Sequence, residues 1–243
     1  LRISGVMTGV IEVSEGEIDL EKMQVLLKSE IEKYNIMNFM PEVSTSEPKE
    51  YGDKSLDCIV LLDTGTKYSI IRNILRTGYR VVRLPWDATY EQIMSYKPKG
   101  VVISNGPGDP KIKTAEKLIK NSAPTLGICL GNQILALAAG ADTYKLKFGH
   151  RGQNKPCIDR NSNQVYVTSQ NHGYGIDPKS MDKTGFKVWF SNADDSTVEG
   201  IEHSTKPMIA VQFHPEASPG PYDCMFVFDR FSQIIRKAGQ SSD

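Results

Sequence analysis

The sequence lacks an excess of charge of either sign. Its 243 residues carry 29 basic and 29 acidic side chains, so the formal net charge is zero. That balance argues against a basic nucleic-acid-binding surface and against the high net charge of a disordered chain. No apolar run is long enough to span a membrane, and the opening residues do not form a signal peptide. We therefore expect a globular protein of the cytoplasm.

Cysteine is scarce, and nucleotide-binding motifs are missing. Cys58, Cys129, Cys157 and Cys224 form no C-x-x-C pair and no Cys/His group with zinc spacing, which predicts neither a disulfide framework nor a metal site. There is no Walker A motif and no G-x-G-x-x-G, so no ATP or dinucleotide site is visible. We expect no cofactor in this chain.

Short apolar runs alternate with helical patterns from about residue 51 onward. The apolar runs lie at 57–63, 79–85, 100–105 and 123–128, and the helical patterns at 67–78, 89–98, 109–121 and 130–140. This alternation predicts an α/β domain with a mostly parallel central sheet and helices on both faces. In such sheets the site lies at the carboxyl ends of the strands. Later strand patterns predict a small antiparallel extension, and residues 224–239 predict a final helix.

The first fifty residues have a different character. Residues 15–35 predict one helix, and the polar, proline-containing stretch 40–55 is typical of a linker. We place a domain boundary there, with residues 1–50 as one part and residues 51–243 as the main domain. Because the first residue is leucine, we expect the chain to begin partway through a longer gene product.

The stretch GICLG at 127–131 places Cys129 between two glycines where a strand pattern becomes a helical one. It fits the G-x-nucleophile-x-G turn, in which small neighbours avoid steric collision. The turn would put the sulfur at a helix N-terminus, where the helix dipole favours the thiolate form. The N–H of Leu130 would then be placed to stabilise an oxyanion. The alternative for Cys129 is an ordinary buried core cysteine.

A cysteine nucleophile needs a base, and His214 is the best candidate. It ends the apolar run MIAVQF, and Glu216 follows two residues later. In extended chain, residues two apart point to the same side, so the carboxylate can orient the imidazole. We predict a Cys129–His214–Glu216 triad. The alternative is a surface His–Glu pair in a loop.

The stretch SNGPGDP at 104–110 follows another strand pattern. Two glycines and two prolines make a rigid loop with few side chains, whose N–H groups can approach a ligand. We predict that the N–H of Gly106 is the second oxyanion donor. The alternative is an ordinary turn.

Taken in order, SNGPGDP, GICLGNQ and VQFHPE resemble the class I, or triad-type, glutamine amidotransferases. The resemblance covers residues 57–237. KFGHRGQNKP, SQNHGYGID and HPEASPGPYD are similar to the small, glutaminase subunits of carbamoyl-phosphate synthetases, and SGVMTGVI resembles the end of their N-terminal domain. The resemblance implies a flavodoxin-like fold, with residues 1–50 as a remnant of that N-terminal domain.

The resemblance also implies a reaction and a partner. The chain would hydrolyse glutamine to glutamate and ammonia through a glutamyl thioester. The ammonia would pass to a large synthetase subunit, which alone would use ATP and Mg²⁺ to make carbamoyl phosphate. The residues implied to contact glutamine are Gly106, Gly108, Leu130, Gln133, Asn171, Gly173 and Tyr174.

This sequence departs from the family pattern at three points. Asn132 stands where many relatives have histidine, and Tyr174 replaces a common phenylalanine. A serine of the missing N-terminal part, which is expected to touch glutamine, has no counterpart here. Alternatives are a glutaminase that serves anthranilate or GMP synthesis, a γ-glutamyl or cysteine peptidase, and a catalytically silent docking subunit.

Overall fold

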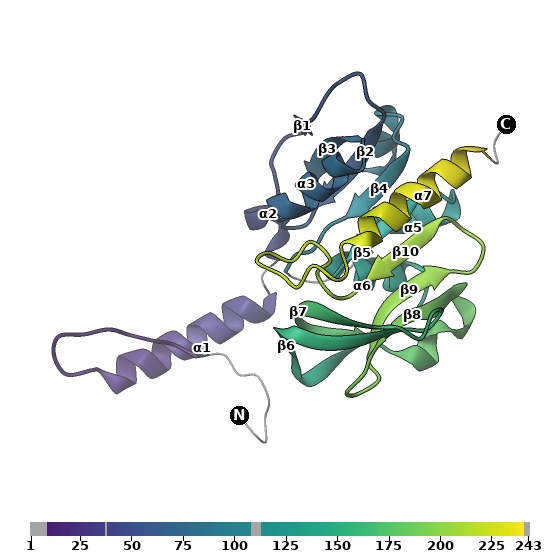
Figure 1. Ribbon diagram of the computed structural model, residues 1–243. Coiled ribbons are helices and arrows are strands. Elements are labelled where there is room, and N and C mark those ends of the chain that lie inside the picture. Colours follow the sequence, from purple (N-terminus) through teal and green to yellow (C-terminus); the bar gives the residue numbers. More distant parts are fainter. Residues whose placement is uncertain (1–8, 37, 108–112, 241–243) are drawn as a thin grey trace.

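A ten-stranded mixed sheet forms the centre of the molecule in the computed structural model, which describes residues 9–36, 38–107 and 113–240 (Figure 1). The strand order within these residues is β1-β3-β2-β4-β5-β10-β9-β7-β6-β8. One half of the sheet is parallel and carries the helices, and the other half is antiparallel. The residues predicted to form the active site come from both halves.

The parallel half is the expected α/β core. Its strands are β2 (Cys58–Asp63), β3 (Arg80–Pro85), β4 (Gly100–Ile103), β5 (Thr125–Ile128) and β10 (Met208–Val211). Adjacent strands in the order β3-β2-β4-β5-β10 pair in parallel. Side chains alternate along each strand, so Val60 and Leu62 join one apolar core while Ile59 and Leu61 join another on the opposite face.

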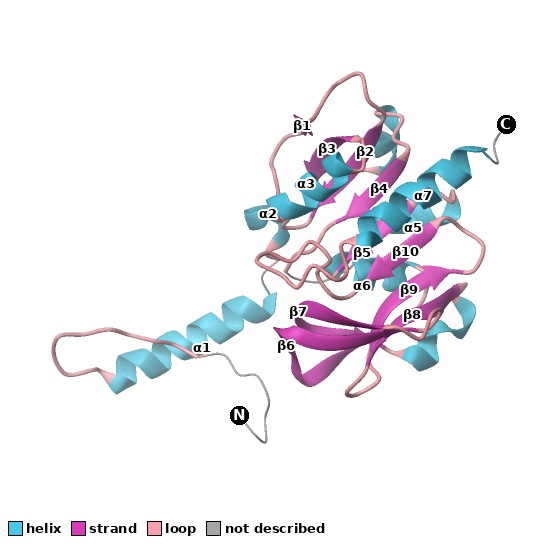
Figure 2. Ribbon diagram, in the orientation of Figure 1, coloured by secondary structure: helices cyan, strands magenta, loops and turns pink. Residues whose placement is uncertain are grey.

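Helices cover both faces, as predicted (Figure 2). Residues of α4 (Tyr90–Ser95), α5 (Lys113–Lys120) and α6 (Leu130–Ala138) belong to the first core, and residues of α3 (Tyr68–Arg76) and α7 (Phe226–Gln240) belong to the second. Thr89 caps α4, because its hydroxyl accepts a hydrogen bond from the N–H of Gln92 at 3.2 Å.

The expectation of a mostly parallel sheet with a small antiparallel extension was wrong in its proportions. β6 (Thr143–Asp159), β7 (Val165–Ile176), β8 (Phe186–Asn192) and β9 (Val198–His203) pair antiparallel with one another, and β9 also joins β10. Because β8 pairs with both β6 and β9, these four strands close into a small barrel. The long β6 escaped prediction because its sequence is polar, contains two glycines and is largely solvent-facing, with register shifts along it.

The N-terminal part divides at about residue 40. Helix α1 (Leu20–Ile36) extends away from the sheet, and its apolar Leu20 and Val25 are exposed (Figure 1). The segment 40–55, expected to be a linker, instead contains α2 (Met40–Val43) and the edge strand β1 (Lys49–Tyr51), which pairs antiparallel with β3. A 3-10 helix, η1 (Pro178–Lys183), precedes β8. Among the described residues, no helix has the length and apolar character needed to cross a membrane.

Candidate active site

Cys129 occupies a strained turn between β5 and α6, as the sequence predicted. Its φ of +54° and ψ of −99° lie in a region that L-residues rarely adopt. The two flanking positions must be glycine, because any side chain there would collide with the backbone. A Cβ on Gly127 would lie 2.5 Å from the carbonyl oxygen of Gly131, and a Cβ on Gly131 would lie 2.2 Å from that of Ile103. The Cys129 N–H donates to the carbonyl of Val211 at 2.8 Å, which fixes the turn against β10.

His214 and Glu216 lie beyond the end of β10, next to Cys129. The Nδ1 of His214 is 2.7 Å from Oε1 of Glu216, and the two side chains are buried. The backbone N–H of His214 donates to the backbone carbonyl of Ser169 at 2.9 Å, which ties the histidine to β7. The structure therefore brings the three predicted triad residues together.

Electrostatics favour the protonated imidazole. Burial lowers the pKa of His214, but the negative charge and hydrogen bond of the Cys129 sulfur, together with Glu216, outweigh burial and raise this pKa to about 10. Burial also opposes the charged form of Glu216 and so raises its pKa. The hydrogen bond to His214 and the positive charges of His214 and Lys67 outweigh burial, so the pKa of Glu216 lies below its ordinary value. A cysteine paired with an imidazolium is the arrangement of an activated nucleophile.

Sequence reasoning missed Lys67. This residue precedes α3, and its Nζ lies 3.3 Å from Oε1 of Glu216 and 3.5 Å from Nδ1 of His214. Its side chain is half exposed, whereas the Glu216 side chain is fully buried. The ammonium therefore helps His214 to stabilise the charged form of this buried carboxylate. The available signal was its position directly after the end of β2, at the carboxyl edge of the sheet.

The two predicted oxyanion donors lie on adjoining segments. Leu130 is the first residue of α6, and Gly106 lies in the loop after β4. Neither N–H has a hydrogen-bond partner among the described residues, so both can bind an oxyanion. The Gly131 N–H donates to the carbonyl of Ser104 at 3.2 Å, which holds this loop against the Cys129 turn. A Cβ on Gly106 would lie only 1.8 Å from the carbonyl oxygen of Thr64, so the site requires glycine.

Gln133 joins the turn to β7. Its Nε2 donates to the carbonyl of Tyr174 at 3.2 Å and to Oε1 of Gln212 at 3.1 Å. Gln212, which the sequence analysis did not single out, also accepts from Asn132 at 3.1 Å and donates to the Cys129 sulfur at 3.7 Å. Asn132 is thus a buried member of this network.

Only some of the remaining residues predicted to contact glutamine lie in the same region. Tyr174 is connected to the site through Gln133, while Gly173 is half-buried. Asn171 is exposed, and in the described part of the chain no hydrogen bond connects it with the triad. Gly108 lies outside the described residues. The surface between α6 and β7 therefore offers backbone and amide groups to a polar ligand, with Cys129 beside them.

Comparison with known proteins places this geometry in a family. The sequence pattern of class-I glutamine amidotransferases matches residues 60–234. A carbamoyl phosphate synthase small chain of Pyrococcus furiosus is 45% identical over 97% of this chain and 64% of its own length. Those of Methanopyrus kandleri and Methanocaldococcus jannaschii are both 44% identical, over 98% and 96% of this chain and 67% and 68% of their own lengths. The chain thus spans about two thirds of these relatives.

Solved structures give the same fold. A crystal structure described as that of a GMP synthase component from Thermoplasma acidophilum aligns with a TM-score of 0.65 and 26% identity, covering 77% of this chain and 98% of that one. A glutamine amidotransferase of Thermotoga maritima aligns with a TM-score of 0.50 and 17% identity, covering 75% and 94%. The second likeness concerns the fold alone.

Proposed function

Because the chain belongs to the class-I glutamine amidotransferases and, within them, to the carbamoyl phosphate synthase small chains, we propose that it hydrolyses glutamine and delivers the ammonia for carbamoyl phosphate synthesis. The observation that carries this proposal is the contact of Cys129, His214 and Glu216 at a strained strand-to-helix turn. Intact triad chemistry also argues against a docking role without activity.

The reaction follows from the geometry. The Cys129 sulfur attacks the side-chain amide carbon of glutamine, and the N–H groups of Leu130 and Gly106 stabilise the resulting oxyanion. His214, oriented by Glu216, protonates the leaving nitrogen, so ammonia departs and a glutamyl thioester remains. His214 then takes a proton from water, which attacks the thioester and releases glutamate. Every group in this cycle belongs to the chain, so we propose that hydrolysis itself needs no cofactor.

Substrate recognition is assigned to the start of α6, the end of β7 and the loop after β4. We propose that the groups implied by the family pattern contact glutamine: Gly106, Gly108, Leu130, Gln133, Asn171, Gly173 and Tyr174. Their backbone and amide groups suit an α-amino acid with an amide tail. Gln133 is already bonded to Tyr174 and Gln212, which supports a preorganised surface.

The partner, location and domain assignment are part of the same proposal. The relatives are named small chains, which supports a larger synthetase subunit as the acceptor of the ammonia. We propose in addition that this partner binds ATP and Mg²⁺ and that the protein is cytoplasmic. We assign residues 51–243 to the amidotransferase domain and residues 1–50 to the remnant of a preceding domain with its linker. The five parallel strands, whose spatial order is 2-1-3-4-5 when they are renumbered along the chain, support a flavodoxin-like core.

The experiment measures ammonia release from glutamine by the chain, with and without a synthetase subunit from a related organism. We expect slow hydrolysis by the chain alone and faster, coupled hydrolysis with the partner. Carbamoyl phosphate made from glutamine by the mixture would support both the activity and the partner. Ammonia release that the synthetase subunit does not change, with no carbamoyl phosphate formed, would support the glutamine hydrolysis and contradict the assignment to carbamoyl phosphate synthesis.

A further inference from the structure

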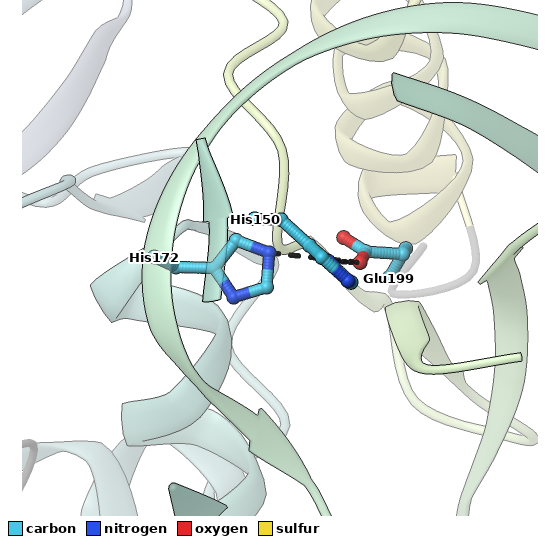
Figure 3. A group of neighbouring side chains, drawn as sticks. All are labelled: His150, His172 and Glu199. Atoms are coloured by element: carbon cyan, nitrogen blue, oxygen red, sulfur yellow. Dashed lines mark hydrogen bonds and ion pairs between the residues drawn. The ribbon is translucent and has the colours of Figure 1, made fainter. Parts of the chain in front are cut away.

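Two histidines and a glutamate that the proposed reaction does not use lie together inside the barrel strands (Figure 3). His150 comes from β6, His172 from the directly opposed position of β7, and Glu199 from β9. All three are buried, and one potential ligand atom from each lies within 4.8 Å of the others. Figure 3 shows a ring nitrogen of His172 turned toward the Glu199 carboxylate, with His150 beside the same group.

The surroundings of His172 require a cation. Its Nδ1 lies 2.8 Å from the carbonyl oxygen of Tyr174, which can only accept, so Nδ1 carries the hydrogen. In a neutral ring Nε2 is then an acceptor. Yet Nε2 faces Oε1 of Gln170 at 3.2 Å and Oε1 of Glu199 at 3.5 Å. A lone pair of Nε2 thus faces two acceptor oxygens, and a proton or a metal ion between them would remove the repulsion.

His150 presents the same situation on the other side of Glu199. Its Nε2 is 2.8 Å from Oδ2 of Asp195, so Nε2 carries a hydrogen. Its Nδ1 is 2.9 Å from Oε1 of Glu199. The amide nitrogen of Asn192 lies 3.5 Å from Nδ1, which is long for a hydrogen bond.

Charge and hydrogen-bond accounting distinguish protons from a metal. The carboxylates of Asp195 and Glu199 carry two negative charges, which either two imidazolium rings or one divalent cation would balance. Protonating both rings satisfies Oε1 of Glu199 but leaves Oε2, which is buried and has no hydrogen-bond partner. A metal ion bound through both oxygens of this carboxylate would give Oε2 a partner, which protons on the two rings would not. The orphaned oxygen therefore favours the metal.

We propose that His150 Nδ1, His172 Nε2 and the Glu199 carboxylate bind one divalent transition-metal ion, with zinc the best match. Two ligands at about 2.0–2.1 Å from a tetrahedral zinc lie about 3.3 Å apart, close to the 2.9 and 3.5 Å between these atoms. Two imidazoles favour zinc-type metals over Mg²⁺ or Ca²⁺.

The outer contacts of the ligands match those of metal-bound histidines. Such histidines donate their other N–H to a carboxylate or a backbone carbonyl, and here Asp195 and the Tyr174 carbonyl accept those hydrogens. The ion would join β6, β7 and β9 and hold the His172–Tyr174 stretch, which adjoins Gln133, in place. Its role is structural, and it takes no part in the chemical steps of the proposed hydrolysis. The ligands lie far apart in sequence on three strands, so no spacing motif revealed them, and the sequence predicted no metal.

Binding should be measured in a Cys129→Ser background, because the Cys129 and His214 side chains could themselves bind zinc. Chelator-treated protein is titrated with Co²⁺, followed by visible absorption, and with Zn²⁺ in a calorimeter. We expect one ion per chain. Glu199→Gln or His150→Gln should weaken binding at least 100-fold, and Asp195→Asn about 10–100-fold. The matched control, His203→Gln, removes a histidine outside the cluster and should leave binding unchanged.

Two results would overturn the proposal. One is an absence of binding to the folded Cys129→Ser chain, which means that protons alone hold the cluster. The other is equal affinity in a folded Glu199→Gln variant. X-ray absorption of the zinc-loaded Cys129→Ser chain gives a readout that does not depend on the folding of further variants. Two imidazoles with oxygen ligands support the site, and a sulfur ligand contradicts it. None of these measurements involves turnover, so their failure would leave the glutaminase proposal untouched.

Discussion

Replacing Glu216 by glutamine isolates what the carboxylate contributes to His214. The variant keeps the size of the side chain and removes its charge. With the glutamine oxygen facing Nδ1, the 2.7 Å contact can persist as a neutral hydrogen bond. The amide nitrogen then takes the place of Oε2, a buried atom without a partner, so a donor is left unsatisfied. We expect this to lower the free energy of unfolding by about 1–3 kcal/mol.

The effect on catalysis should be larger than the effect on folding. A hydrogen bond to a charged group contributes about 1.5–3 kcal/mol, which corresponds to roughly 10–100-fold in rate. If the amide nitrogen faces Nδ1 instead, the imidazole adopts the wrong tautomer, and losses reach about 10⁴-fold in comparable triads. We therefore expect kcat for glutamine hydrolysis to fall by about 10–10⁴-fold, depending on which way the amide faces, measured as ammonia release across a range of pH.

The matched control is Glu202→Gln. Glu202 is also a buried carboxylate on the barrel, paired with Arg230 at 2.7 Å and Lys187 at 2.9 Å, but it lies outside the triad. Its loss should reduce stability and leave kcat within about 3-fold of the parent. A Glu216→Gln variant with near-normal kcat, or an equal loss of kcat in Glu202→Gln, would refute the assignment of Glu216 as the group that orients His214.

Three further predictions concern the same site. Lys67→Met keeps the aliphatic stem but removes the half-exposed charge 3.3 Å from Glu216, so kcat/KM should fall about 2–5-fold in steady-state assays, and an unchanged value would remove Lys67 from the site. Gly131→Ala should lower the free energy of unfolding by about 1–3 kcal/mol in urea titrations and abolish activity, because its Cβ meets the Ile103 carbonyl at 2.2 Å. Gly239→Ala, with open space around it in helix α7, should not lower the free energy of unfolding and should leave activity unchanged. Because the pKa of His214 is raised from 6.5 to about 10, its charged form stabilises the fold fully below about pH 6.5 and loses this effect as the pH rises toward 10. The stability difference between the parent and His214→Gln should therefore shrink between pH 7 and 10, and a constant difference would contradict the ion pair.

The parallel half of the fold and the triad were predictable because their signals are local. Buried parallel strands are continuous apolar runs, and the steric demand at Gly127 and Gly131 is written into the sequence next to Cys129. His214 and Glu216 were found through the two-residue repeat of extended chain.

What escaped prediction depends on contacts between distant segments. Lys67 and Gln212 act only because the sheet brings the ends of β2 and β10 beside the turn. β6 has a polar, solvent-facing sequence, and only its pairing with β7 and β8 makes it a strand. The His150, His172 and Glu199 cluster likewise exists only once three strands close into a barrel.

The central claim, that Cys129 is the nucleophile, is tested most directly by trapping the thioester. The chain is mixed with glutamine, quenched in acid within the first turnover, digested and analysed by mass spectrometry. Burial raises the pKa of the Cys224 thiol to about 12 and raises that of Cys157 still further, so neither should react. We predict a glutamyl adduct on the peptide that contains Cys129 and on no other cysteine peptide. Ammonia release without that adduct under acid quench, or an adduct on Cys157 or Cys224, would contradict the mechanism.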